Sequence, residues 1–321
     1  MDKAHKKYIF YIDVFSYCNL RCPSCVVGNE FGDYKNWPHG LMSTELLGRI
    51  LDKAMSECEI QSVGLYNWTE PLLHPDLPSL VREVKKRGLN CALSSNLNVL
   101  RDPEKLLVEQ PDWFRISVSG FTQPVYEIGH LGGNIGKVTE NMKRLAEAKR
   151  AVGAMTSIHV FYHRYLHNLD EASLMEEFAR SLGFEFDTCL AQMFPVEKII
   201  AFAEGQATDR DRKLQALFAL PLDRALQITS REHKPECSLL EDVITIDVTG
   251  NVMLCCGSSL ERSNIVGQYL EYPLDEIQRM RRMKSLCGKC LKLGIPDYFE
   301  GASPYFEAIA KETISGHRLR G

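Results

Sequence analysis

The chain has 321 residues, of which 45% are hydrophobic and 25% are charged, and its formal net charge is −4. This length suits one large domain or a large and a small one, and the mildly acidic balance argues against a nucleic-acid partner, which usually requires a basic face. We find no apolar run long enough to span a membrane and no secretory signal. The eleven cysteines therefore predict metal ligation in a reducing cytoplasm rather than disulfides.

Apolar runs typical of β-strands alternate with amphipathic runs typical of helices. Strands are expected at 8–15, 61–68, 90–95, 113–119, 155–163 and 184–192, with helices between them that include 43–58, 77–87, 135–152 and 169–182. Six β–α units in series predict a parallel sheet with helices outside it. Side chains at the carboxyl ends of the strands should then converge on one mouth, where parallel barrels carry their chemistry.

The first expected strand leads into the run Cys-Asn-Leu-Arg-Cys-Pro-Ser-Cys, which places Cys18, Cys22 and Cys25 on one short loop. A tetrahedral metal site closed by protein usually takes four ligands. Three thiolates on a tight loop can instead hold an iron–sulfur cubane and leave one iron open. The spacing also fits a zinc site completed by a distant histidine, or buried thiols without a ligand.

Because this CxxxCxxC run follows the first strand, the sequence resembles the radical S-adenosylmethionine (SAM) enzymes. The resemblance implies an α/β fold, a partial (β/α)6 parallel barrel, with a [4Fe–4S] cluster bound by the three cysteines. It implies that the open iron chelates the amino and carboxylate groups of SAM. An electron from an external donor such as flavodoxin or ferredoxin then releases a 5′-deoxyadenosyl radical.

The same resemblance assigns SAM-binding roles to residues at later strand ends. In the family a Gly-Gly-Glu-Pro motif closes the second strand and holds the SAM amino group; here Thr69 and Glu70 stand at its place, and both glycines are replaced. A strand end with a proline-initiated turn explains these residues equally well. Loop turns also favour the residue types of the expected ribose and carboxylate contacts. These contacts are Ser94, Asn96, Ser117 and Ser119.

Three further residues are candidates for catalysis. His159 and His163 share one face of the fifth expected strand, where they either bind substrate or act as a base near neutral pH, or are satisfied polar residues of the barrel wall. Asp13 is flanked by apolar residues, and a buried carboxylate needs a partner or a function. The basic run 279–284 is expected on solvated helix faces.

A second cysteine group lies near the C-terminus. Cys237, Cys255, Cys287 and Cys290 follow the order Cys…Gly-x4-Cys…Cys-x2-Cys, which looks like the SPASM/twitch extension of radical SAM enzymes. The resemblance implies one auxiliary [4Fe–4S] cluster with four thiolates and no open iron, and a zinc ribbon is the alternative. Three roles stay open for Cys256: it replaces Cys255 as a ligand, packs inertly, or donates a hydrogen atom to a substrate radical.

We therefore expect a radical SAM core at 1–204, a helical connector at 205–235 and an auxiliary cluster domain at 236–321. The predicted enzyme abstracts a hydrogen atom from a small polar substrate of sugar or aminocyclitol type and dehydrogenates or epimerises it. The alternatives are maturation of a ribosomal peptide and a non-catalytic electron-transfer protein with two clusters. A first strand that begins at residue 8 leaves no room for an N-terminal peptide-recognition domain, and an open iron is not needed for pure electron transfer.

Overall fold

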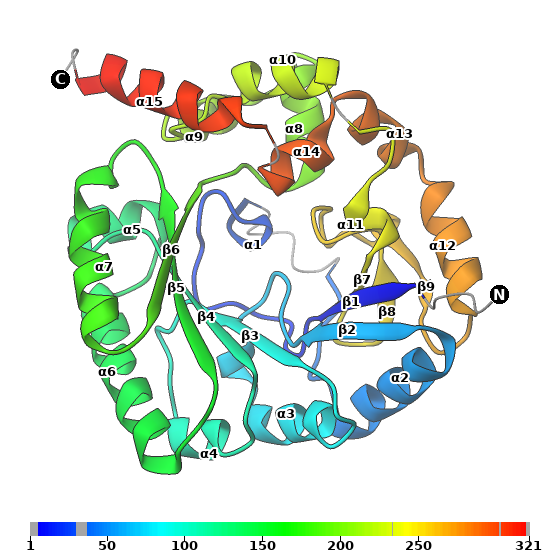
Figure 1. The fold of residues 1–321 in the computed structure, drawn as a ribbon. Coiled ribbons are helices and arrows are strands. Elements are labelled where there is room, and N and C mark those ends of the chain that lie inside the picture. The colour runs from blue at the N-terminus through cyan, green and yellow to red at the C-terminus, as the bar shows by residue number, and fades with distance from the viewer. Residues whose placement is uncertain (1–5, 30–36, 233, 302, 319–321) are drawn as a thin grey trace.

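The structure is a computed structural model of the 321-residue chain, and it describes all residues except 1–5, 30–36, 233, 302 and 319–321. Six strands pair in chain order, each parallel to the next, in a curved sheet (Figure 1). They are β1 (Lys7–Ile12), β2 (Glu59–Gly64), β3 (Cys91–Ser95), β4 (Trp113–Val118), β5 (Ser157–Arg164) and β6 (Glu185–Leu190). The predicted α/β fold with a partial parallel barrel is confirmed.

The helices that connect these strands cover the outer side of the sheet (Figure 1). They are α2 (Thr44–Glu57), α3 (Leu77–Lys85), α4 (Pro103–Leu107), α5 (Gln123–Gly129), α6 (Ile135–Val152) and α7 (Ala172–Ser181). The connections also contain the short turns η2 (Pro71–Leu73) and η3 (Leu169–Glu171), while α1 (Val26–Asn29) lies inside the curve of the sheet. Helix α6 has the predicted bounds because its ends are capped. The Asn134 side chain accepts a hydrogen bond from the Lys137 N–H, and Gly153 ends the helix with a φ of 63°.

The C-terminal region extends the same sheet. Strand β7 (Val243–Ile246) pairs parallel with β1 and forms an antiparallel hairpin with β8 (Asn251–Met253), which pairs with β9 (Ile265–Gln268). Gly250 turns the hairpin with a φ of 87°, at the position where the sequence predicts a tight turn. The other elements are α8 (Val196–Ala203), α9 (Asp209–Gln215), α10 (Leu222–Glu232), α11 (Ser238–Glu241), η4 (Arg262–Asn264), α12 (Leu274–Arg282), α13 (Ser285–Lys292), α14 (Ile295–Glu300) and α15 (Tyr305–Arg318). The division into three domains stays a prediction.

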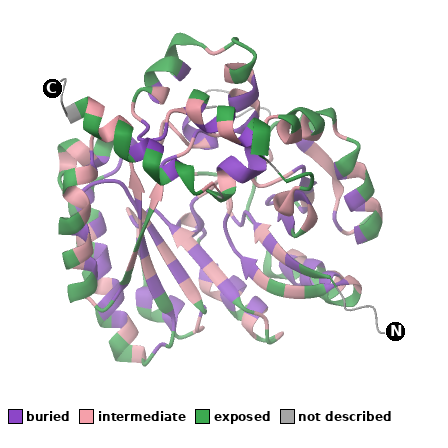
Figure 2. Cartoon of the chain, turned by 45° about the horizontal axis from the view of Figure 1, so that its top comes forward, coloured by how far each residue is buried: buried purple, intermediate pink, exposed green. Residues whose placement is uncertain are grey.

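The described residues form two large apolar cores and a smaller cluster around Val26 and Trp37. The larger lies between the sheet and the outer helices and includes Phe10, Phe114 and Val160, while the second joins α8, α10 and α14 through residues such as Leu222 and Tyr298. In Figure 2 most strands alternate between buried and partly buried residues, and the outer faces of the helices are exposed. No helix in the described ranges is both long and apolar enough to cross a membrane.

Candidate active site

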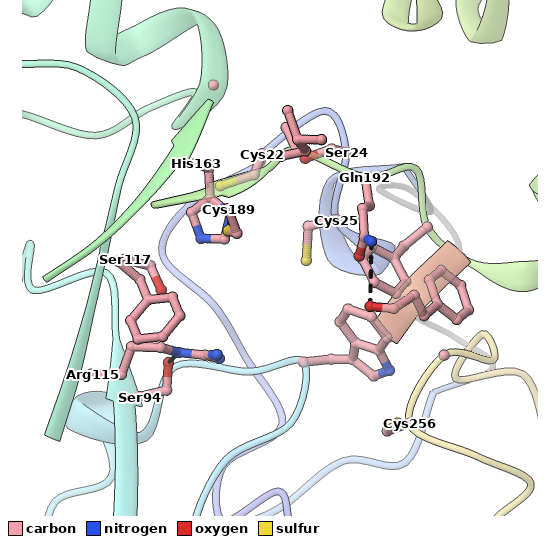
Figure 3. A pocket seen from close by; sticks show the side chains of 18 of the residues that line it. Cys22, Ser24, Cys25, Ser94, Arg115, Ser117, His163, Cys189, Gln192 and Cys256 are labelled. Atoms are coloured by element: carbon pink, nitrogen blue, oxygen red, sulfur yellow. Dashed lines mark hydrogen bonds between the residues drawn. The ribbon is translucent and has the colours of Figure 1, made fainter. Parts of the chain in front are cut away.

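A cavity of about 660 Å³ lies at the carboxyl ends of the parallel strands. Its walls come from the loop after β1, the ends of β2–β6, the loop after β8 and helix α14 (Figure 3). The wall does not include Asp13, His159 or Ser119. The predicted site residues that the structure brings together here are Cys18, Cys22, Cys25, Thr69, Glu70, Ser94, Asn96, Ser117, His163 and Cys256.

The three-cysteine loop is held tightly against neighbouring backbone. The Leu20 N–H donates a hydrogen bond to Cys18 Sγ (3.5 Å), and the side-chain amide of Asn96 donates to the same sulfur (3.7 Å). Gly28 packs so closely that a Cβ atom on it would lie 2.0 Å from the carbonyl oxygen of Cys22. Hydrogen bonds to sulfur tune and orient iron–sulfur sites. This loop therefore fits the predicted three-thiolate cluster.

The thiols of this loop are buried, and burial raises the pKa of both Cys18 and Cys22 well above the usual range. Metal coordination has the opposite effect, because a coordinating thiol is deprotonated. Within the described residues, no group of three or more His, Cys, Asp or Glu side chains is placed to hold a single metal ion. In a cubane each thiolate binds a different iron, so its ligands are spaced more widely than the ligands of one ion.

Asp13 lies beneath the loop that follows β2. Its Oδ1 accepts hydrogen bonds from the backbone N–H groups of Asn67 (3.0 Å), Trp68 (3.1 Å) and Thr69 (3.1 Å), and from the Thr69 hydroxyl (2.6 Å). Burial raises the pKa of Asp13 to about 6, although these hydrogen bonds act in the other direction. Asp13 is not in the cavity wall, and its hydrogen bonds hold the loop 67–69 in position. This placement favours a positioning role over the predicted catalytic role.

Glu70 ends this loop and faces the cavity. Its Oε2 accepts a hydrogen bond from the Asn96 N–H (2.8 Å) and its Oε1 accepts one from the Leu72 N–H (3.1 Å). Only 3% of the residue is exposed, and burial raises the pKa of its carboxyl group to about 7. The side chain of Asn96 also contacts Cys18, so Asn96 connects Glu70 with the cysteine loop.

The position of a predicted residue along its strand decides whether it reaches the cavity. His163 lies near the end of β5 and faces the cavity, but His159, four residues lower on the same face, binds Ser157 (2.9 Å) and Asp187 (3.1 Å) outside the wall. The hydroxyl of Ser119 is fully buried against Nδ1 of His130 (2.6 Å). The structure therefore does not place His159 or Ser119 where they can touch a ligand in this cavity.

Cys189 lines the cavity, although no role is predicted for it from the sequence. Its Sγ lies 3.4 Å from Nδ1 of His163 on the adjacent strand, and Figure 3 shows the two side chains together. Burial raises the pKa of the Cys189 thiol, but His163, with help from Arg115 and Arg164, shifts it below the usual value overall. Period-two geometry on β6 gives the face of Cys189, but the partner comes from pairing with β5.

The four C-terminal cysteines converge on a second cavity of about 30 Å³, as expected for one auxiliary site. Cys237 precedes α11, Cys255 follows β8, and Cys287 and Cys290 lie three residues apart on α13. Cys256 lines the large cavity instead. The two adjacent cysteines therefore face different spaces, which favours Cys255 as the ligand and leaves Cys256 beside the space available to a substrate.

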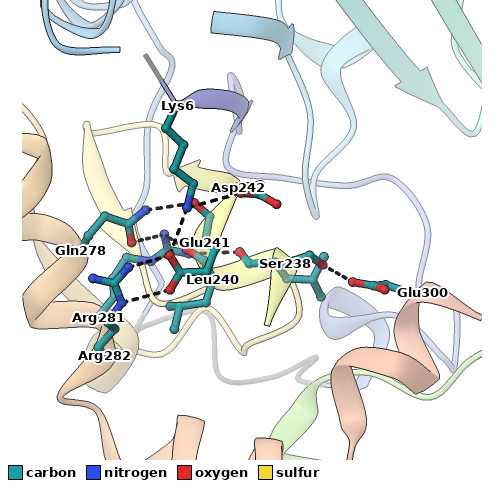
Figure 4. A network of polar contacts seen from close by, with 10 residues as sticks. Lys6, Ser238, Leu240, Glu241, Asp242, Gln278, Arg281, Arg282 and Glu300 are labelled. Carbon is teal, nitrogen blue, oxygen red and sulfur yellow. Dashed lines mark hydrogen bonds and ion pairs between the residues drawn. The ribbon is translucent and has the colours of Figure 1, made fainter. Parts of the chain in front are cut away.

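Arg281 contradicts the expectation that the basic run 279–284 is solvated, because its side chain is fully buried. The guanidinium donates hydrogen bonds to the backbone carbonyls of Leu254 (2.8 Å) and Leu240 (2.9 Å) and to Gln278 Oε1 (3.1 Å) (Figure 4). Its neighbour Arg282 pairs with Glu241 at the surface. None of the described carboxylates pairs with Arg281. A buried guanidinium without a counter-charge is energetically costly, and an anionic group at the four-cysteine site would balance its charge.

Comparison with known proteins identifies the superfamily of the chain. The family model described as the radical SAM superfamily matches residues 12–172, and the chain belongs to this superfamily. A Pyrococcus furiosus protein described as a tungsten-containing aldehyde ferredoxin oxidoreductase cofactor-modifying protein is 32% identical over 153 residues. That match covers 46% of this chain and 40% of the relative, so the chain matches less than half of the relative's length.

Solved structures share the fold at low sequence identity. Streptococcus suis SuiB bound to the precursor peptide SuiA has a TM-score of 0.58 at 13% identity, and the likeness covers 91% of this chain and 71% of that one. Native anSMEcpe with bound AdoMet has a TM-score of 0.55 at 13% identity, with 96% and 99% covered. At this identity the likeness shows the fold alone.

Proposed function

We propose that this protein cleaves SAM reductively and abstracts a hydrogen atom from a small polar substrate. Membership of the superfamily supports an enzyme that uses SAM and a [4Fe–4S] cluster. The observation that carries the proposal is the cavity of about 660 Å³, which has the three-cysteine loop on one wall and Cys256 on another. It offers one shared space for a cofactor and a substrate.

The chain's own residues have distinct parts in this proposal. When bound, the clusters and SAM supply electron transfer and the 5′-deoxyadenosyl radical, and Cys18, Cys22 and Cys25 would hold the cluster that binds SAM. The Glu70 carboxylate would accept hydrogen bonds from the ammonium group of bound SAM. Asp13 keeps the loop that carries Glu70 in place. These roles separate binding from positioning, because Asp13 acts only through the backbone of the loop.

Cavity size supports a small substrate. Pockets that bury a drug-sized ligand measure about 300–1,000 Å³, so a cavity of about 660 Å³ suits SAM with one small molecule. The Pyrococcus relative is described as modifying a cofactor, which also favours a small molecule. The peptide bound to SuiB supports the second candidate, in which part of a peptide enters the same cavity and is crosslinked or epimerised.

The residues of the cavity leave two outcomes for the substrate radical. In dehydrogenation the substrate radical would lose a proton to a base, for which we propose His163 in the cavity wall. Its electron would pass to the auxiliary cluster that the four C-terminal cysteines would hold. In epimerisation a thiol, Cys256 or Cys189, would return a hydrogen atom to the substrate radical. An electron from the external one-electron donor and a proton from water would then convert the thiyl radical back to the thiol. Turnover in deuterium oxide separates these outcomes, because only hydrogen return by an exchangeable thiol places deuterium directly on the product carbon.

The proposal is tested by anaerobic reconstitution, iron and sulfide counting, and a search for 5′-deoxyadenosine after reduction in the presence of SAM. We expect two [4Fe–4S] clusters and SAM cleavage. Cys58→Ala is a matched control, since Cys58 is a buried thiol outside both cysteine groups whose Sγ donates to the Ala54 carbonyl. Absence of 5′-deoxyadenosine from a fully reconstituted protein contradicts the proposal, and modification of a peptide with no small-molecule turnover favours the second candidate.

A further inference from the structure

An arginine that pairs with no acidic side chain among the described residues forms part of the deeper wall of the large cavity. Arg115 stands in the middle of β4, and its Nε donates a hydrogen bond to the Ser94 hydroxyl (2.8 Å) on the adjacent strand. Its guanidinium lies 5.3, 5.9 and 5.5 Å from the ring centroids of Tyr66, Trp113 and Phe161. The rings and the hydroxyl fix the orientation of the cation before any ligand arrives.

The two terminal nitrogens of Arg115 are left for a ligand. Among the described residues neither makes a hydrogen bond or an ion pair, and Figure 3 shows the side chain on the cavity wall beside Ser94 and Ser117. Arg164, another arginine in this wall, pairs with Glu307 instead. A guanidinium with its fork free matches the two oxygens of a carboxylate or phosphate.

We propose that Arg115 and Ser94 form a subsite for a carboxylate or phosphate group of the substrate. This deepens the proposed function, on which it rests, by adding an anionic group to the expected small polar substrate. The Ser94 hydroxyl accepts from Arg115 Nε, so its own proton is available to the bound anion. An aminocyclitol that carries only cationic groups fits this subsite poorly, whereas a sugar acid or a sugar phosphate fits it well.

The depth of the subsite separates it from the SAM carboxylate. Asn96, whose side chain contacts Cys18, comes two residues after Ser94, directly beyond the end of β3 at Ser95. A strand rises about 3.3 Å per residue, so the level of Ser94 and Arg115 lies about 7 Å deeper than the level of the cysteine loop. Glu70 and Asn96, which the family resemblance assigns to SAM, lie at the upper level with Cys18. The subsite proposed here takes Ser94 away from the SAM contacts that the sequence predicts and assigns it to the substrate. An anion at Arg115 therefore belongs to a second molecule below SAM.

The test uses inorganic phosphate as the probe on the anaerobically reconstituted protein, at constant ionic strength. Trp113 lies beside Arg115, so its emission reports occupancy. We expect saturable phosphate binding that Arg115→Gln weakens by at least about tenfold, because a charge-assisted pair is lost. Arg115→Lys, which keeps the charge, should weaken it less. Arg82→Gln removes a surface arginine that pairs with Glu109 and should change nothing.

Equilibrium dialysis with SAM identifies the source of the anion. We expect SAM affinity to be unchanged in Arg115→Gln and unaffected by phosphate. Loss of SAM affinity in that variant together with competition between SAM and phosphate would assign the subsite to the SAM carboxylate and overturn the proposal. Equal phosphate binding by wild type and Arg115→Gln, or no saturable binding by wild type, also overturns it. SAM cleavage is scored separately, so its absence counts against the proposed function and not against the subsite.

Discussion

Replacing the buried Arg281 should change the reduction potential of the proposed auxiliary cluster. The guanidinium binds the carbonyls of Leu254 and Leu240, which belong to the segments that carry Cys255 and Cys237. It is fully buried, and no described carboxylate pairs with it. Since reduction adds a negative charge to the cluster, a fixed cation nearby stabilises the reduced form. Arg281→Gln should therefore lower the potential.

The size of the shift follows from the position of the charge. Arg281 contacts Leu254, the residue before Cys255, so its charge would lie roughly 7 Å from the centre of a cluster bound by Cys255. At an effective dielectric constant of about 20, a unit charge at this distance contributes about 2 kcal/mol. For a one-electron couple about 59 mV corresponds to a tenfold change in the equilibrium constant. The potential of the Arg281→Gln variant should thus fall by about 100 mV.

The assay is a redox titration of the reconstituted protein followed by electron paramagnetic resonance. Arg281→Lys keeps the positive charge, so its reduction potential should stay close to that of the wild type. Arg282→Gln is the matched control, because the adjacent arginine is about half exposed and pairs with Glu241. Equal potentials in wild type and Arg281→Gln, with the cluster intact, would refute the electrostatic reasoning.

Other predictions concern the cysteine groups and pH. Replacement of all three cysteines in the loop Cys18–Cys25 should remove about four irons and abolish 5′-deoxyadenosine formation while the auxiliary cluster stays; retained cleavage refutes the assignment. Cys255→Ala should lose the auxiliary cluster and Cys256→Ala should keep it, by iron counting; the reverse result exchanges their roles. Burial raises the pKa of Asp13 from 3.8 to about 6, so its contribution to the free energy of unfolding, present below about pH 4, should be lost by about pH 6. This difference of about 2.2 pK units corresponds to up to about 3 kcal/mol. Urea denaturation should show no such loss in Asp13→Asn.

The sequence predicted elements best where local signals set their ends. Helix α6 matches its predicted range because Asn134 and Gly153 cap it. The second strand was predicted to continue to residue 68 but ends at Gly64. Beyond that point the loop folds around the carboxylate of Asp13, more than fifty residues earlier in the chain. A contact of that range leaves no trace in hydrophobic periodicity.

The same limit applies to the candidate site. The cysteine loop was found because its ligands are close in sequence, but period-two geometry gives only the face of a side chain and not its depth. For this reason His159 was predicted together with His163, although only His163 reaches the cavity. Arg115 and Cys189 were missed because their contacts cross between strands.

The relative placement of the two cysteine groups follows from the sheet itself. Strand β1 leads into the three-cysteine loop, and it pairs along its length with β7, which is joined through a tight hairpin to the segment carrying Cys255 and Cys256. Backbone hydrogen bonds extend this ladder from Ile9 (2.8 Å to the Asp242 carbonyl) to Asp13 (2.9 Å to the Ile246 carbonyl). A shared parallel ladder is stiffer than a flexible linker. If the proposed function is correct, backbone pairing sets the distance across which an electron or a hydrogen atom would pass between the two groups. The proposed subsite of Arg115 and Ser94 lies on β4 and β3, on the other side of β1 from β7.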